Sequence, residues 1–297
     1  MLFEYALDPR LLNNWANFRY YYESFGVSEG RLISRYPKHW ERLVYESLDG
    51  CGEIERKKIV ERLAEIKSRL MNAGRPYDAD KDWLLNAEIS HSFREFRAII
   101  ASANPRKRDF VLDGHALDSH DPRWKSETRL PLPRQGRELA KALTLLLQIS
   151  RNLVLVDRHF TPTQPRFRNT LQALVTASRK VTGAYPDRIE LLVSPESDFA
   201  FFRNECVSRL SALFATTVVV HVRILAEIPG GEKLHNRYIL TERGGAFLGI
   251  GLDEGEAGES DDLALMSTSQ FDRRWTQYGQ GAPAFSTVYE FDVVGRL

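Results

Sequence analysis

The strongest constraint on the fold of this chain is a regular alternation of helical and strand-like segments after Gly136. Three compact apolar segments begin at Asn152, Arg188 and Thr217, and each follows a stretch with helical periodicity. A hairpin follows, in which "KLHNRYILT" and "GGAFLGIGL" flank a turn at "ERGG", and "STVYEFDVVG" supplies a last strand. Alternation at this spacing predicts an α/β domain over residues 137–297, with a mixed sheet flanked by helices.

The first 103 residues indicate a different, mainly α-helical domain. Ile59, Leu63, Ile66 and Leu70 fall on one face of a helix. Residues 104–136 are rich in Pro, Asp, Gly and Ser and have weak periodicity, which predicts a connector. We expect the N-terminal domain to contact a protein partner.

Composition excludes several classes of protein. The 297 residues include 41 basic and 40 acidic side chains, a balance that argues against a polybasic coat for nucleic acid. The two cysteines, Cys51 and Cys206, have no metal-binding or disulfide spacing, which favours a reducing compartment. No signal-peptide pattern opens the chain, and no apolar run approaches the roughly 20 residues that span a bilayer. A cytoplasmic protein without a membrane span is therefore expected.

The hairpin carries the pattern His235-x-Arg237-x4-Glu242, followed by Gly249-Ile250-Gly251-Leu252. This pattern resembles the His-x-Lys-x4-Asp and Gly-Ser-x-Asn elements of one half-domain of the phospholipase D superfamily. Arg237 in place of lysine keeps a permanent charge that can grip two phosphate oxygens. Glu242 is one methylene longer than aspartate, and the polar pair of the second element is lost. The resemblance therefore implies a degenerate phosphate-handling site.

The run "HNRYILTERGGAFLGIGLD" also resembles the phospholipase D-like C-terminal domain found after microtubule-interacting-and-transport modules. That family is understood to bind membrane phosphoinositides or partners rather than to catalyse, and related hairpins occur in bacterial defence systems. The resemblance implies a phospholipase D-like α/β domain in an accessory component of an antiviral defence or DNA-processing complex.

An active site of this family would need neither a metal nor a cofactor. The resemblance implies that His235 would attack phosphorus, Arg237 would neutralise the phosphoryl oxygens and Glu242 would orient His235. A second histidine would protonate the leaving oxygen. It would come from a second copy of the chain in a homodimer, or from His159 at the end of the first apolar segment.

Other polar residues extend the candidate phosphate surface. They are Asn236 in the motif, Arg166 and Arg168 on the helix after the first strand, and the cluster Arg106, Lys107 and Arg108. The acidic stretch from Asp253 to Asp262 would repel a polyanion unless its carboxylates fold away. His115 and His120 stand among aspartates, but their spacing matches no common metal motif, so no metal site is predicted.

The sequence leaves three functions open. The favoured one is a degenerate phospholipase D-like module that binds DNA, other nucleic acid or another phosphate-bearing partner. The second is a metal-independent nuclease or phosphodiesterase, active as a homodimer. The third is a non-catalytic protein-protein adaptor with a purely structural hairpin.

Overall fold

The computed structural model describes residues 1–72, 74–194 and 198–297. Contacts divide the chain into two compact units, Leu2–Glu127 and Thr128–Leu297, and Met1 groups with the second. The boundary falls inside the 104–136 segment that was expected to be a connector. Both units combine strands with helices, so the chain is a mixed α/β protein.

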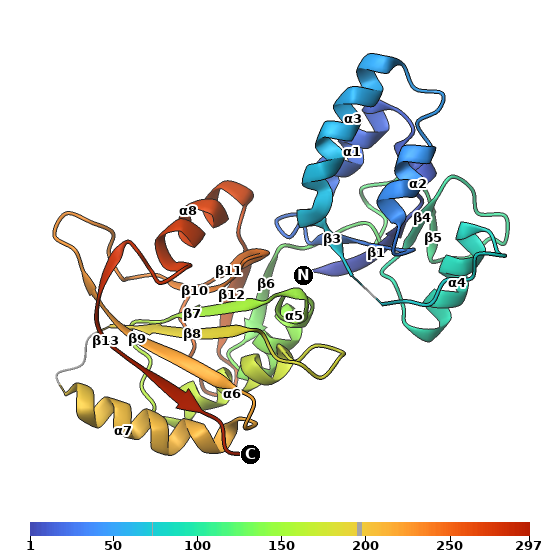
Figure 1. The fold of residues 1–297 in the computed structure, drawn as a ribbon. Coiled ribbons are helices and arrows are strands. Elements are labelled where there is room, and N and C mark those ends of the chain that lie inside the picture. The colour runs from blue at the N-terminus through green and yellow to red at the C-terminus, as the bar shows by residue number, and fades with distance from the viewer. Residues whose placement is uncertain (73, 195–197) are drawn as a thin grey trace. The chain divides into compact units, whose positions relative to one another are not determined.

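The N-terminal unit contains a five-stranded parallel sheet in the order β3-β2-β1-β4-β5 (Figure 1). Its strands are β1 (Phe3–Leu7), β2 (Arg31–Ser34), β3 (Leu70–Met71), β4 (Ile99–Ala101) and β5 (Val111–Asp113). Its helices are α1 (Trp15–Ser24), α2 (Trp40–Glu46), α3 (Glu53–Glu65) and α4 (Trp83–Phe93), with 3-10 turns η1 (Pro9–Leu12) and η2 (Ile66–Arg69).

The prediction of a mainly helical N-terminal domain anticipated helices in this unit but missed its five-stranded sheet. The strands have two to five residues and are largely buried, so they show no polar alternation that the sequence could reveal. β5 also lies within the supposed connector. One core packs against α1, α2 and α3, and a second core packs against α4.

The C-terminal unit contains an eight-stranded sheet in the order β13-β9-β8-β7-β10-β11-β12-β6. Its strands are β6 (Arg129–Pro133), β7 (Asn152–Val156), β8 (Arg188–Val193), β9 (Val219–Glu227), β10 (Arg237–Thr241), β11 (Gly244–Leu248), β12 (Ser260–Leu265) and β13 (Phe285–Val294). β7, β8 and β9 are parallel, and the remaining neighbours pair antiparallel.

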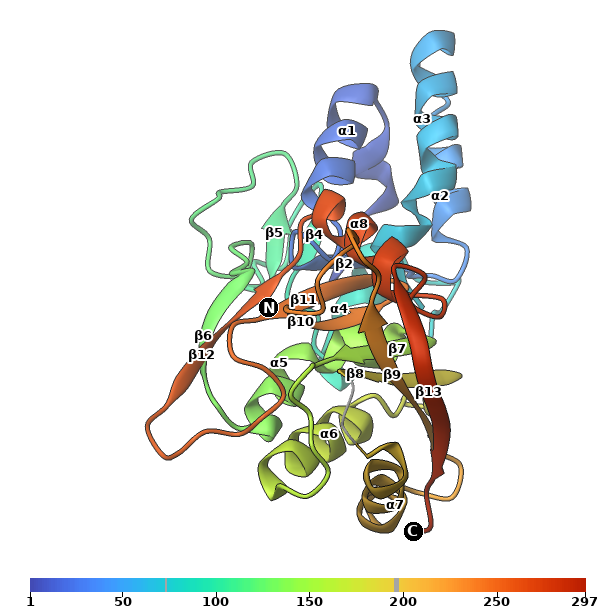
Figure 2. The same cartoon turned by 90° about the vertical axis from the view of Figure 1, so that its left-hand side faces the viewer.

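The helices of this unit are α5 (Gly136–Ile149), α6 (Pro165–Ala177), α7 (Phe199–Leu210) and α8 (Thr268–Tyr278), with a 3-10 turn η3 (Ser211–Leu213). Figures 1 and 2 show α5, α6 and α7 on one face of the sheet and α8 on the other. The predicted α/β alternation is confirmed, and so is the hairpin, whose strands β10 and β11 turn at Glu242 and Arg243. In the described ranges, no helix has the length and apolar character needed to cross a membrane.

Candidate phosphate-binding site

The candidate site lies at the edge of the C-terminal sheet where the parallel strands end. β10 runs antiparallel to β7, and Tyr238 pairs with Val156. The residues just before β10 therefore meet those just after β7. This register brings the His235–Arg237 segment beside Asp157, at an edge where α/β sheets commonly bind ligands.

Arg237 is a half-buried cation at this edge. Its Nε atom is inaccessible to solvent and has no hydrogen-bond partner within the described ranges. No carboxylate among those residues forms an ion pair with it. An unpaired donor in a buried position is unfavourable.

Asp157 lies beneath Arg237 and is 1% exposed. One carboxylate oxygen accepts the backbone N–H of Leu252 at 2.7 Å, and the other accepts the N–H of His159 at 2.9 Å. Burial raises the pKa of Asp157, while these two donors and the charge of Arg237 oppose that rise. Asp157 thus joins the end of β7 to the loop after β11, and we did not single it out in the sequence, although an aspartate directly after an apolar strand marks such an edge.

Gly251 permits the close approach of this loop. Its φ is +142°, and a Cβ atom placed on it would lie 2.6 Å from Oδ2 of Asp157 and 3.4 Å from Nε of Arg237. The adjacent Ile250 is 41% exposed, and its N–H donates to Asp261. Since the N–H groups of Ile250 and Leu252 are both committed to protein carboxylates, neither replaces the lost Ser and Asn side chains of the resembled motif.

The two histidines of the edge are both exposed. The ring of His235 makes no hydrogen bond or ion pair within the described ranges, and its backbone N–H donates to the Lys233 carbonyl. His159 lies after β7, at the same edge. No direct interaction joins the two rings in the described part of the chain, so the structure does not pair His159 with His235.

Glu242 does not have the role expected from the motif. It follows β10 and so lies at the opposite end of this strand from His235. Its two oxygens accept the backbone N–H groups of Arg151 and Asn152, each at 2.8 Å. These contacts fix the start of β7, and we correct the expectation that Glu242 orients His235.

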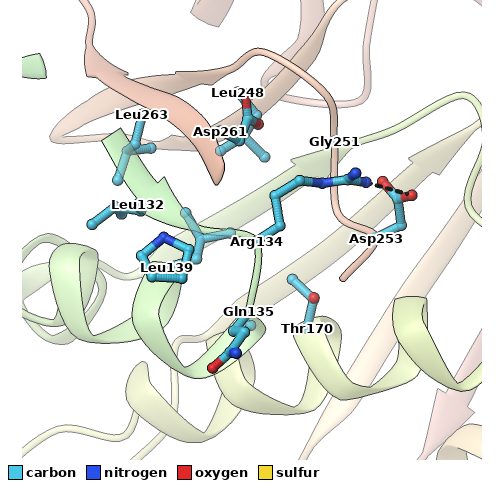
Figure 3. Close-up of a pocket in the computed structure, with 12 residues that line it drawn as sticks. Leu132, Arg134, Gln135, Leu139, Thr170, Leu248, Gly251, Asp253, Asp261 and Leu263 are labelled. Atoms are coloured by element: carbon cyan, nitrogen blue, oxygen red, sulfur yellow. Dashed lines mark hydrogen bonds and ion pairs between the residues drawn. The ribbon is translucent and has the colours of Figure 1, made fainter. Parts of the chain in front are cut away.

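Part of the acidic stretch after β11 is paired within the protein, while Glu256 and Asp262 are exposed. Arg134 forms an ion pair with Asp253 at 2.9 Å (Figure 3) and another with Glu259 at 2.5 Å. Glu254 accepts the N–H of Gly136 and the side-chain amide of Asn169. Figure 3 shows a small pocket between the end of β6 and this loop. Arg134 lines this pocket, and its charge is neutralised by its acidic partners.

The other predicted basic residues are only partly available. Arg166 lies 3.8 Å from Asp253, and Arg168 donates to the carbonyls of Pro162 and Thr163. In the N-terminal unit, Arg106 pairs with the buried carboxylate of Glu88. Lys107 and Arg108 are exposed in the β4–β5 loop, and Asn236 is half-buried beside Arg237.

No group of three or more metal-ligating side chains forms among the residues that the structure describes. Asp113 and Asp118 accept the backbone N–H groups of His115 and His120, which are turn contacts.

Comparison with known proteins does not assign a family. No protein-family model matches the sequence, and no curated protein matches it. Among solved structures, TrmBL2, an archaeal chromatin protein described as showing a novel mode of DNA binding, aligns with a TM-score of 0.28 and 9% identity. The alignment covers 54% of this chain and 55% of TrmBL2, just over half of each. A TM-score this low supports no conclusion about fold or function.

Proposed function

We propose that the C-terminal unit is a non-catalytic, phospholipase D-like module that binds a phosphate group of nucleic acid, with Arg237 as the direct contact. The observation that carries this proposal is the half-buried guanidinium of Arg237. Within the described ranges it forms no ion pair and its Nε has no hydrogen-bond partner, although the charge of the buried Asp157 lies near it. An arginine fork matches two phosphate oxygens. Because Nε is closed off from solvent, the phosphate would contact the terminal Nη groups of the guanidinium.

Contacts within the protein reduce the repulsion that the nearby acidic loop would exert on a polyanion at Arg237. Arg134 neutralises part of the charge of Asp253 and Glu259, and Glu254 is hydrogen-bonded to Asn169 and the backbone. Glu256 and Asp262 remain exposed. Asp157 is buried and has both oxygens occupied by N–H donors. The exposed His235 and the neighbouring Asn236 can add contacts without adding negative charge.

The same geometry supports binding over turnover. A histidine nucleophile of this class needs an orienting carboxylate and a second histidine as acid. Glu242 is engaged at the far end of β10, and His235 has neither kind of partner in the described ranges. The proposal therefore places this chain as an accessory, non-cleaving component of a nucleic-acid complex, such as a defence or DNA-processing assembly.

Fluorescence anisotropy with a labelled single-stranded deoxyoligonucleotide tests the proposal. We expect Arg237→Ala to weaken binding by about tenfold or more, because a charge-assisted hydrogen bond contributes about 1.5–3 kcal/mol. Arg151→Ala is the matched control, since Arg151 is an exposed arginine at the opposite end of β7, paired with Asp187. Equal weakening by both substitutions would reduce the effect to net charge and refute a specific site.

A phosphodiesterase assay in EDTA separates binding from catalysis. The proposal predicts no turnover of oligonucleotide by the native protein or by His235→Ala. Turnover that disappears in His235→Ala would favour the metal-independent nuclease, with its second histidine supplied by another copy of the chain. Binding of no oligonucleotide at all would favour the adaptor.

A further inference from the structure

The strand β13 forms one edge of the C-terminal sheet and pairs with β9 on one side only (Figure 1). It has ten residues and no proline. The opposite edge strand, β6, carries Pro131 and Pro133, which lack N–H groups. The edge strands of the N-terminal sheet, β3 and β5, have only two and three residues. Among the sheet edges that the structure describes, β13 alone is both long and free of proline, so it can pair with another chain.

The free backbone groups of this edge follow from the ladder between β13 and β9. Just past the end of β13, the N–H of Gly295 donates to the carbonyl of Val218. Because hydrogen-bonded pairs alternate along an antiparallel ladder, every second residue before Gly295 directs its N–H and C=O to β9. The backbone groups of Glu290, Asp292 and Val294 therefore point away from β9. No carbonyl in the described part of the chain accepts these three N–H groups.

One face of β13 is acidic. Glu290 and Asp292 are two residues apart, so they share a face, and they line a hollow of about 360 Å³ that opens to solvent. Their side chains are 61% and 56% exposed. Arg223 lies 3.4 Å from Glu290, and Nδ1 of His221 lies 2.5 Å from Asp292.

The arginines beside this hollow are already engaged by a buried carboxylate. Glu190 is 1% exposed and pairs with Arg188 at 2.8 Å and with Arg223 at 3.2 Å. Arg223 is therefore shared between Glu190 and Glu290. Counting Asp292, three carboxylates face two guanidinium groups, so while His221 is uncharged a cation on an added strand would meet unneutralised acid.

The other face of β13 is aromatic. Tyr289 and Phe291 are half-buried there. The ring of Phe199 in α7 stacks on Tyr289 with centroids 5.6 Å apart, and Phe202 meets Phe291 edge to face at 6.3 Å. Apolar side chains on this face of an added strand would extend the aromatic row.

We propose that β13 is a docking edge for an extended segment of a partner protein in which basic residues alternate with apolar ones. Its backbone would pair with Glu290, Asp292 and Val294, its basic side chains would meet the acidic face, and its apolar side chains would meet Tyr289 and Phe291. A second copy of this chain fits less well, because a two-fold pairing centred on the acidic residues would place carboxylates opposite each other. The inference is independent of the function proposed for Arg237.

Fluorescence anisotropy of the full chain with a labelled short peptide of alternating lysine and valine tests the proposal. We expect saturable binding, and binding at least about tenfold weaker when glutamate replaces lysine. N-methylation of the lysine amides removes the donors that face β13 and should weaken binding by about tenfold or more. N-methylation of the valine amides, which face away from β13, should change it by no more than about threefold.

Substitutions in the protein locate the edge. Val294→Pro removes an outward N–H without breaking the ladder to β9, and should weaken the lysine peptide about fivefold. Val181→Pro, in a turn where this valine is 84% exposed, is its matched control. The double change of Glu290→Gln and Asp292→Asn should also cost about fivefold, whereas Glu256→Gln removes an exposed acid elsewhere and should cost less than about twofold.

Amide hydrogen exchange provides the decisive comparison. The amides of Glu290, Asp292 and Val294 should exchange more slowly when the lysine peptide is bound, and circular dichroism should show that each variant is folded. Equal binding of the peptide methylated at its lysine amides, or equal binding of the glutamate peptide, would overturn the proposal. Protection of the same amides by raised protein concentration alone would assign the edge to a second copy and would overturn it as well.

Discussion

Replacement of Gly251 by alanine tests the contact that assembles the candidate site. Gly251 has a φ of +142°, a conformation that side chains other than glycine rarely adopt. The added methyl group would lie 2.6 Å from Oδ2 of Asp157, the oxygen that accepts the N–H of Leu252. Either the loop or the buried carboxylate must therefore move.

The expected cost has two parts. Backbone strain in this region of φ contributes about 1–2 kcal/mol. Displacement of Asp157 breaks a hydrogen bond of a buried carboxylate and adds about 1–3 kcal/mol. We therefore expect Gly251→Ala to reduce the free energy of unfolding of the C-terminal unit by about 2–5 kcal/mol, measured by urea denaturation or differential scanning calorimetry.

Gly258 supplies the matched control for strain alone. Its φ is +94°, and a methyl group added there would meet no atom within 4 Å. Gly258→Ala should therefore cost only the strain, about 1–2 kcal/mol, and should leave oligonucleotide binding unchanged. Equal destabilisation by the two substitutions would refute the claim that Gly251 is required by its approach to Asp157.

Three further predictions concern single carboxylates and the motif histidine. Glu242→Ala leaves the N–H groups of Arg151 and Asn152 without their acceptor and should cost about 1–3 kcal/mol in urea denaturation, with oligonucleotide binding intact. His235→Ala removes an exposed ring and should change stability by less than about 0.5 kcal/mol. The pKa of Asp157 in the folded protein is raised above its ordinary 3.8. The folded state therefore binds this proton more tightly than the unfolded state, and protonation of Asp157 stabilises the fold at low pH. The native protein should therefore lose stability relative to Asp157→Asn as pH rises above about 4, and a relative gain in thermal melts would contradict the raised pKa.

The part of the fold that followed from sequence is the part with strong periodicity. Most helices and strands after Gly136 are long enough to display their repeats, and the β10–β11 hairpin is local in sequence. The exceptions are β12, which lies partly in the acidic stretch, and α8, and neither was predicted. The N-terminal sheet was missed because buried parallel strands as short as Leu70–Met71 do not alternate between apolar and polar residues.

Only the residues of the candidate site that lie within the sequence motif could be predicted. The motif pointed to Arg237, but the partners of its neighbours are distant in sequence. Glu242 binds backbone groups 90 and 91 residues away, and Asp157 binds Leu252, 95 residues away. Spacing within a motif cannot reveal such pairings, because the tertiary fold decides which side chains meet.

The salt dependence of oligonucleotide binding tests the central claim most directly. Each phosphate contact on a single strand contributes about 0.7 to the slope of log K against log salt concentration, since its neutralisation releases counterions. We predict that Arg237→Ala lowers the magnitude of this slope by about 0.7, whereas Arg151→Ala leaves it as in the native protein. A slope that is unchanged in Arg237→Ala would show that Arg237 contacts no phosphate and would contradict the account.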